Sequence, residues 1–102
     1  RLILREPGSV TRAILERALA AARVRPGATL EVGSREGVRE AVAAGLGVGA
    51  IFESEFGNDD RLHFLKVRDP GLEAMEYAAC LSDRRNAPVV SAFFALLPTA
   101  AA

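Results

Sequence analysis

The stretch of residues 33–52 constrains the possible fold of this chain more than any other. Ser34 is a residue whose hydroxyl can accept a hydrogen bond from the open amides of a first helical turn, and apolar residues then recur at helical spacing up to Gly45. Gly45 can take the positive φ that ends a helix. The apolar run of residues 48–52 is typical of a strand that is covered on both faces. This succession predicts half of a parallel α/β unit, a fold in which ligands bind where strand ends meet helix starts.

Similar signals run through the first two thirds of the chain. They predict strands at residues 2–5, 29–32 and 62–67, and a helix from Ser9 to about Ala22. Gly47 and Gly49 are expected where strand and helix backbones approach closely. Residues 53–60 are expected to form a loop or a single helical turn, because 57–60 is strong turn sequence. The expected fold class is therefore α/β with a mainly parallel sheet.

The residues after 69–71 resume the pattern beyond a predicted break or hinge. Apolar and polar residues alternate over residues 73–81, which predicts a strand with one face more covered than the other. Residues 82–86 are expected to form a polar turn. Pro88 is well placed to open a last helix, which carries apolar residues such as Phe93 and Phe94.

Composition narrows the classes of function. Of the 102 residues, 13 are basic and 13 acidic, so no net charge attracts this chain to nucleic acid or to a membrane surface. The single Cys80 cannot form an internal disulfide, which fits a reducing compartment such as the cytoplasm, and we expect it to be a small buried hydrophobic residue. One histidine and one cysteine make no credible metal site. No cofactor motif is present, such as a phosphate-binding loop, a dinucleotide fingerprint or a nucleophile elbow.

The first candidate site is the turn around Ser9, between the first strand and the first helix. It offers the hydroxyls of Ser9 and Thr11, the cation Arg12 and the unpaired amides after Gly8, with no acidic residue in the first turn. Such a helix start attracts an external anion. On this segment alone, however, an ordinary serine cap and a solvated arginine are the favoured interpretation, because serine caps are common.

Two further candidates follow later strands. Ser34 begins a helix that already carries Glu36 in its first turn, so a plain cap is favoured over a ligand role there. The segment Phe52-Glu53-Ser54-Glu55 stands at the expected carboxyl end of the third strand, which faces the cleft in open α/β sheets, so Phe52 or Ser54 could contact a ligand. Phe52 can equally complete the core. His63, which we place on a strand, is expected to be structural or to face solvent.

The order of three segments resembles the effector-binding domain of LysR-type transcriptional regulators. The segments are Arg5-Glu6-Pro7-Gly8-Ser9-Val10-Thr11-Arg12, Leu30-Glu31-Val32-Gly33-Ser34 and Val42-Ala43-Ala44-Gly45-Leu46-Gly47-Val48-Gly49, of which the last is the most specific. The resemblance implies a partial three-layer αβα fold like that of type II periplasmic binding proteins. Residues 1–69 would then form the second lobe, residues 70–97 a strand and helix that return to the first lobe, and residues 98–102 a tail. The amino-acid sequence of the first segment particularly resembles that of a subgroup associated with aminoethylphosphonate breakdown.

The resemblance also implies a function without catalysis. Effectors in this family are usually small anions or carboxylates held between the lobes, so it implies effector-binding roles for six residues: Ser9, Thr11, Arg12, Ser34, Phe52 and Glu53. It implies a homo-oligomeric cytoplasmic regulator that contacts DNA through a domain absent from this chain. The apolar residues Phe93, Phe94 and Leu97 would then be exposed unless they find another partner.

Two other functions share this architecture. The first is a lobe of a solute-binding protein that serves a transport system. The second is an enzyme, which would need a positioned acid or base in the cleft, and only Glu6 or Glu53 could serve. A helix-turn-helix, a signal peptide or neither at the start of the intact protein would separate the three.

Overall fold

The computed structural model describes residues 1–68 and 72–98 of the chain. In order, its elements are β1 (Leu2–Arg5), α1 (Val10–Ala21), β2 (Thr29–Val32), α2 (Arg35–Ala43), β3 (Val48–Gly49), α3 (Glu53–Phe56), a short 3₁₀ helix (Ser82–Arg84) and α4 (Pro88–Ala95). The predicted break at residues 69–71 and the predicted tail after Pro98 lie outside the described residues. No helix among the described residues is long and apolar enough to span a bilayer.

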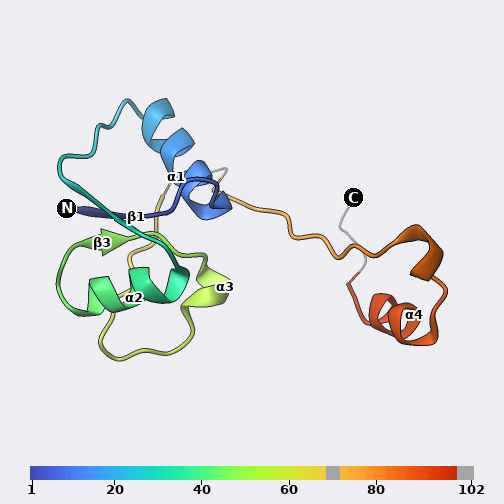
Figure 1. Cartoon of the computed structure of the whole chain (residues 1–102). Coiled ribbons are helices and arrows are strands. Elements are labelled where there is room, and N and C mark those ends of the chain that lie inside the picture. Colours follow the sequence, from blue (N-terminus) through green and yellow to red (C-terminus); the bar gives the residue numbers. More distant parts are fainter. Residues whose placement is uncertain (69–71, 99–102) are drawn as a thin grey trace.

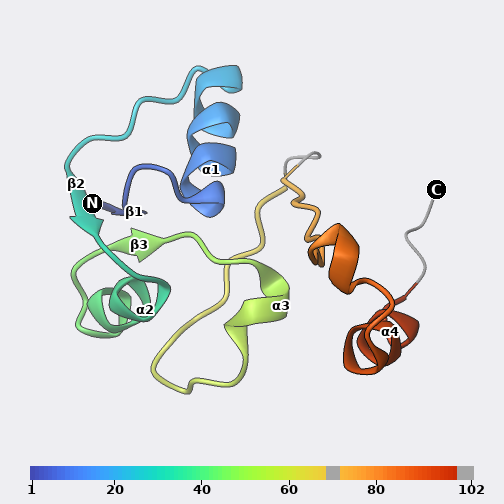
Figure 2. The ribbon, with the colours of Figure 1, turned by 45° about the vertical axis from the view of Figure 1, so that its right-hand side comes forward.

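The three strands form one parallel sheet in the order β2-β1-β3. In its register, Ile3 of β1 stands between Leu30 of β2 and Gly49 of β3. Helix α1 lies on one side of this sheet and α2 on the other (Figures 1 and 2). The predicted parallel α/β unit is therefore confirmed, as a small sheet between two helices.

Local signals at the helix ends behave as the sequence indicates. The Ser34 hydroxyl accepts a hydrogen bond from the Gly37 amide at 2.9 Å, and the Ser9 hydroxyl accepts a longer one, of 3.4 Å, from the Arg12 amide. Just after α2, Gly45 has φ +78°, a left-handed conformation that glycine adopts without steric cost. Both predicted caps and the glycine stop are confirmed.

The core lies around the central strand. Among the described residues the buried hydrophobic side chains are Ile3, Leu4, Ile14 and Val38. Ile3 is the most enclosed of them, with 1% of its surface exposed. A Cβ built on Gly49 would lie 2.6 Å from Val38 Cγ1 and 4.0 Å from Ile3 Cβ, so β3 and α2 meet on the Ile3 side of the sheet. The predicted close approach at Gly49 is confirmed.

The third strand is shorter than the sequence pattern indicates. It covers Val48–Gly49 instead of residues 48–52, and Val48 is 56% exposed. β3 pairs with β1 only where Val48 stands opposite Leu2 and Gly49 opposite Ile3, and no described residue pairs with its other edge. A strand continues only as far as a neighbouring backbone takes up its hydrogen bonds, and the pairing of β3 ends at Gly49.

The strands predicted at residues 62–67 and 73–81 do not form among the described residues. Their alternating pattern is correct for strands, but no neighbouring backbone in the described part of the chain pairs with them. The first of these segments is held by an aromatic contact, in which the rings of Phe56 and Phe64 lie 5.2 Å apart and tilted. His63 is exposed, which confirms the solvent-facing alternative, although not on a strand.

The C-terminal part extends away from the sheet (Figure 1). The radius of gyration is 17.2 Å, whereas a compact domain of this length has about 13 Å. Helix α4 begins at Pro88 as predicted, and the predicted exposure of Phe93, Phe94 and Leu97 is confirmed. The prediction that Cys80 is buried is wrong, because its segment packs on nothing in the described structure and the thiol is exposed.

Candidate functional site

The carboxyl ends of the parallel strands meet at one edge of the sheet, and a cavity of about 60 Å³ lies there. Its polar lining comes from Arg5, which ends β1, from Thr11 of α1, from Arg35 and Arg39 of α2, and from Glu55 and His63 of the following segment. Its lining also includes apolar residues, among them Val38 and Val42 of α2 and Ile51 after β3. Three arginines therefore surround one small cavity at the edge where α/β proteins bind ligands.

Arg5 is held by its neighbour in the sequence. Its Nε and Nη2 donate hydrogen bonds to the two carboxylate oxygens of Glu6, at 2.8 and 2.7 Å. This two-point contact with a cation lowers the pKa of Glu6 to about 2. Glu6 is therefore ionised at neutral pH and cannot act there as a general acid, one of the two roles that the enzyme alternative allows.

Arg35 reaches across the cavity to α3. Its Nη1 donates to Glu55 Oε1 at 2.7 Å, with Arg35 49% and Glu55 20% exposed. Arg35 is the first residue of α2, directly after the Ser34 cap, and Glu55 lies on the single turn that follows β3. The contact joins two elements that both begin at the carboxyl edge of the sheet.

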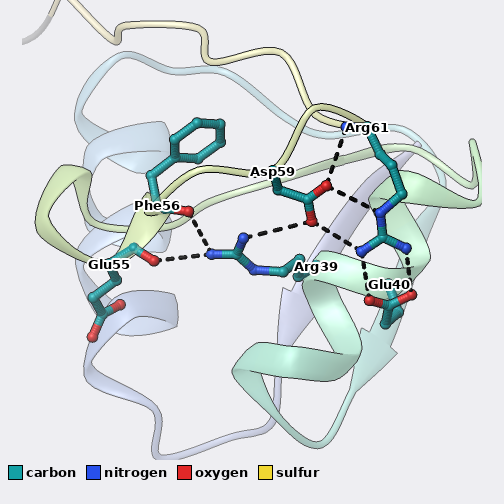
Figure 3. A network of polar contacts seen from close by, with 6 residues as sticks. All are labelled: Arg39, Glu40, Glu55, Phe56, Asp59 and Arg61. Carbon is teal, nitrogen blue, oxygen red and sulfur yellow. Dashed lines mark hydrogen bonds and ion pairs between the residues drawn. The ribbon is translucent and has the colours of Figure 1, made fainter.

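A set of four residues, which we call the α2–α3 clasp, fixes the loop after α3 to α2 (Figure 3). It consists of Arg39, Glu40, Asp59 and Arg61. Arg39 Nη2 donates to the backbone carbonyl oxygens of Glu55 and Phe56 at 2.9 and 2.6 Å. Its Nη1 lies 3.7 Å from Asp59 Oδ2. Arg39 thus satisfies carbonyls at the end of α3 that the short helix leaves open.

Arg61 completes the clasp from the other end of the loop. It donates to both carboxylate oxygens of Glu40, at 3.0 and 2.8 Å, and to both oxygens of Asp59. These side-chain contacts raise the pKa of Arg61 and lower that of Glu40. Because an arginine carries its charge at any physiological pH, the clasp depends on the ionisation of its two carboxylates.

The clasp makes a pH-dependent prediction. Hydrogen bonds from the Arg61 side chain, and then from its amide, lower the pKa of Asp59 from 3.8 to about 2. A carboxylate whose pKa is lowered by folding contributes stability above its unfolded pKa, and that stability is lost as the pH falls through the folded pKa. We expect the clasp to weaken between about pH 4 and pH 2, with an NMR titration of the Asp59 carboxyl carbon showing a midpoint near 2.

The Arg61→Gln variant tests the cause of this shift. Its Asp59 midpoint is expected to move toward 3.8, whereas Arg17→Gln on the exposed side of α1 leaves it near 2. An unchanged midpoint in Arg61→Gln would show that Arg61 does not hold Asp59.

The six residues expected in the site from the sequence take different places. Thr11 lines the cavity, and both Thr11 and Phe52 line a larger adjoining groove of about 390 Å³. Ser9, Arg12, Ser34 and Glu53 are not among the residues that line either hollow. The structure therefore brings two of the six to the hollows at this edge.

Ser9 and Arg12 make contacts within the chain. Ser9 is 8% exposed and caps α1. Arg12 donates to Glu16 at 2.9 Å, to Glu31 at 2.8 Å and to the Arg5 carbonyl oxygen at 2.8 Å. The absence of an acidic residue in the first turn of α1 is confirmed, but Glu16, one turn later on α1, and Glu31 of β2 balance the charge of Arg12.

Ser34 and Glu53 stand at helix starts. Ser34 uses its hydroxyl to cap α2, and Glu53 is the exposed first residue of α3. Sequence reasoning missed the cavity residues Arg5, Arg35 and Arg39, and it included Glu55 only as part of the candidate segment 52–55. The signal for two of them was present, because Arg5 ends a parallel strand and Arg35 follows the next one, positions that face the cleft. Among the residues described, no group of His, Cys, Asp and Glu is arranged to hold a metal ion.

Comparison with known proteins adds an independent line of evidence. The sequence pattern of the LysR substrate binding domain matches residues 1–102. The chain is 36% identical over 103 residues to the RuBisCO operon transcriptional regulator of Acidithiobacillus ferrooxidans, covering 98% of this chain and 33% of that protein. It is 30% identical over 102 residues to the HTH-type transcriptional regulator CbbR of Rhodospirillum rubrum, covering 97% and 34%. A CbbR of Xanthobacter flavus is 33% identical over 100 residues, covering 94% and 30%.

The chain thus spans about a third of the length of these regulators. No solved structure matches it. The names of these relatives do not support the aminoethylphosphonate subgroup expected from the first segment. They are transcriptional regulators, which does not favour the solute-binding or enzymatic alternatives.

Proposed function

Because this chain belongs to the LysR substrate binding domain family, we propose that it senses a small anionic effector at the carboxyl edge of its sheet. The observation that carries the proposal is the cavity at this edge, where Arg5, Arg35 and Arg39 converge beside the Thr11 hydroxyl. Arginine is the side chain best suited to carboxylates and phosphates, because its planar guanidinium donates two parallel hydrogen bonds to them.

The size of the cavity supports a small charged group. About 60 Å³ is room for a carboxylate or phosphate group, whereas pockets for a whole organic ligand are usually about 300–1,000 Å³. The charged end of the effector would enter the cavity. Its remaining part would lie in the adjoining groove, beside Phe52 and Phe64.

The six residues expected from the sequence divide into two roles in this proposal. Thr11 contacts the anion, and Phe52 contacts the remainder of the effector. Ser9, Arg12, Ser34 and Glu53 act around the site: the two serines fix the starts of α1 and α2, Arg12 ties α1 to β2 through Glu31, and Glu53 begins α3.

The wider setting of the proposal follows from the relatives. We propose that the intact protein is a cytoplasmic, homo-oligomeric regulator that contacts DNA through a part not contained in these residues. Effector binding would bias the packing of the oligomer through its different affinity for two conformations. The proposal requires no cofactor and no catalysis.

The decisive experiment is an anion titration of the intact protein. We would add inorganic phosphate, sulfate, small carboxylates and phosphonates, and follow the melting temperature. A ligand at 100 times its Kd stabilises the folded state by about 2.7 kcal/mol. Replacing Arg35 by glutamine is expected to weaken binding about tenfold, because hydrogen bonds to charged groups contribute about 1.5 kcal/mol or more.

Arg17→Gln is the matched control. It removes one positive charge from the exposed surface of α1, and Arg17 is not among the residues that line the cavity. If Arg35→Gln and Arg17→Gln bind phosphate equally well, the anion site lies elsewhere and the proposal fails.

A further inference from the structure

The three arginines of the cavity differ in how firmly their guanidinium groups are held. Arg39 donates to two backbone carbonyl oxygens and faces Asp59, so it is committed to the clasp. Arg5 makes a two-point contact with Glu6, the next residue in the chain. Arg35 makes one side-chain hydrogen bond, to Glu55, and is half exposed. Of the three, Arg35 is the arginine that can change partners at the lowest cost.

The partner of Arg35 belongs to the same cavity. Glu55 is the carboxylate among its polar lining residues, and its Oε1 lies 2.7 Å from Arg35 Nη1. A carboxylate in that place presents to Arg35 the same oxygen geometry that an incoming carboxylate or phosphate would present. It also repels a second anion in the same cavity.

The backbone of Glu55 is fixed independently of its side chain. Arg39 binds the Glu55 carbonyl oxygen at 2.9 Å, and the Glu55 amide donates to the Phe52 carbonyl oxygen at 2.9 Å. The Glu55 carboxylate points away from the clasp (Figure 3). The side chain can therefore leave Arg35 by rotation about its own bonds while α3 stays in place.

We propose that Glu55 sets the affinity of the anion site by occupying Arg35, so that an oxyanion binds only after displacing the Glu55 carboxylate. This inference rests on the proposed function, and it adds an internal competitor to that site. The apparent association constant then equals the intrinsic one multiplied by the fraction of molecules in which Arg35 is released. Anions with two negative charges, such as phosphate, would displace Glu55 more readily than anions with one.

The test is a phosphate titration of the intact protein, with Kd measured by calorimetry. Glu55→Gln keeps the size and shape of the side chain and removes the competing charge. It is expected to bind inorganic phosphate about two- to fivefold more tightly than the wild type, the range that corresponds to an exposed ion pair. Glu36→Gln is the matched control, because it removes one negative charge from the residue next to Arg35, and Glu36 is not among the residues that line the cavity.

A double mutant shows whether Glu55 acts through Arg35. In an Arg35→Gln background, the gain from Glu55→Gln is expected to be clearly smaller, because no guanidinium is left to release and only the repulsion between Glu55 and the anion is relieved. The same gain in both backgrounds would mean that Glu55 acts only as a nearby charge, and it would overturn the inference.

The remaining outcomes separate the two proposals. If the wild type binds phosphate through Arg35 but Glu55→Gln binds no more tightly than Glu36→Gln, the inference is wrong and the anion site stands. If Glu55→Gln binds phosphate and the wild type does not, the inference is supported, because the Glu55 carboxylate of the wild type then keeps the anion off Arg35. If neither the wild type nor Glu55→Gln binds phosphate, sulfate or carboxylates, both proposals fall.

Discussion

Replacing Ile3 by alanine is expected to lower the free energy of unfolding by about 3 kcal/mol, since removing most of an enclosed aliphatic side chain costs about 2–5 kcal/mol. Ile3 is 1% exposed and lies on the central strand, between β2 and β3 and against α2. Hydrogen bonds fix the spacing of β1, β2 and β3, so no single neighbouring side chain can move in to fill the cavity that is left behind. Domains are commonly stable by only about 5–15 kcal/mol, so this is a large share.

Urea denaturation followed by circular dichroism measures the effect. Val10→Ala is the control, because Val10 is 63% exposed on α1 and exposed substitutions usually change stability by less than about 0.5 kcal/mol. If Ile3→Ala and Val10→Ala unfold at the same urea concentration, the core does not lie on β1.

Replacing Gly49 by alanine is expected to cost about 1–3 kcal/mol by overpacking. The added Cβ would lie 2.6 Å from Val38 Cγ1 and 3.1 Å from Val42 Cγ2. Both valines are β-branched residues on α2, and a helix allows them essentially one rotamer, so neither can turn aside freely. Either β3 or α2 has to move, and with it the wall of the cavity.

The control and the rescue for this prediction come from the same chain. Gly27→Ala meets no atom within 4 Å, so its stability is expected to stay the same or rise slightly. In the double variant Gly49→Ala, Val38→Ala, the space made at Val38 is expected to accommodate the new methyl group. Its loss of stability in urea denaturation should therefore be smaller than the sum of the single losses. Strict additivity would contradict the overpacking explanation.

The sequence predicted the candidate site only in part, because some charged residues pair with residues that are distant in the sequence. The edge of the sheet was predictable from strand ends and helix starts, and of the six residues expected there, Thr11 and Phe52 line the hollows. The charge on Arg12 was also evident from the sequence. Its contact with Glu31 was not, because Glu31 lies 19 residues away and meets Arg12 only when β2 packs beside β1.

Arg35, the arginine that matters most in our proposals, also meets its partner only in the folded chain. Arg35 follows a cap in the sequence and resembles an ordinary exposed helix residue. Its place opposite Glu55, 20 residues further on, depends on the return of the chain through β3. The clasp between Arg61 and Glu40 is likewise a contact of the folded loop with α2.

The amino-acid sequence by itself determined the features that depend on neighbours within a few residues. These are the serine caps of α1 and α2, the glycine stop at Gly45 and the proline start of α4. Only the tertiary structure decided which alternating segments became strands and which residues far apart in the sequence form ion pairs, as Arg12 and Glu31 or Arg35 and Glu55 do. A cap is completed by amides one turn away, whereas a strand at residues 62–67 or 73–81 needs a second backbone beside it, and no described residue supplies one.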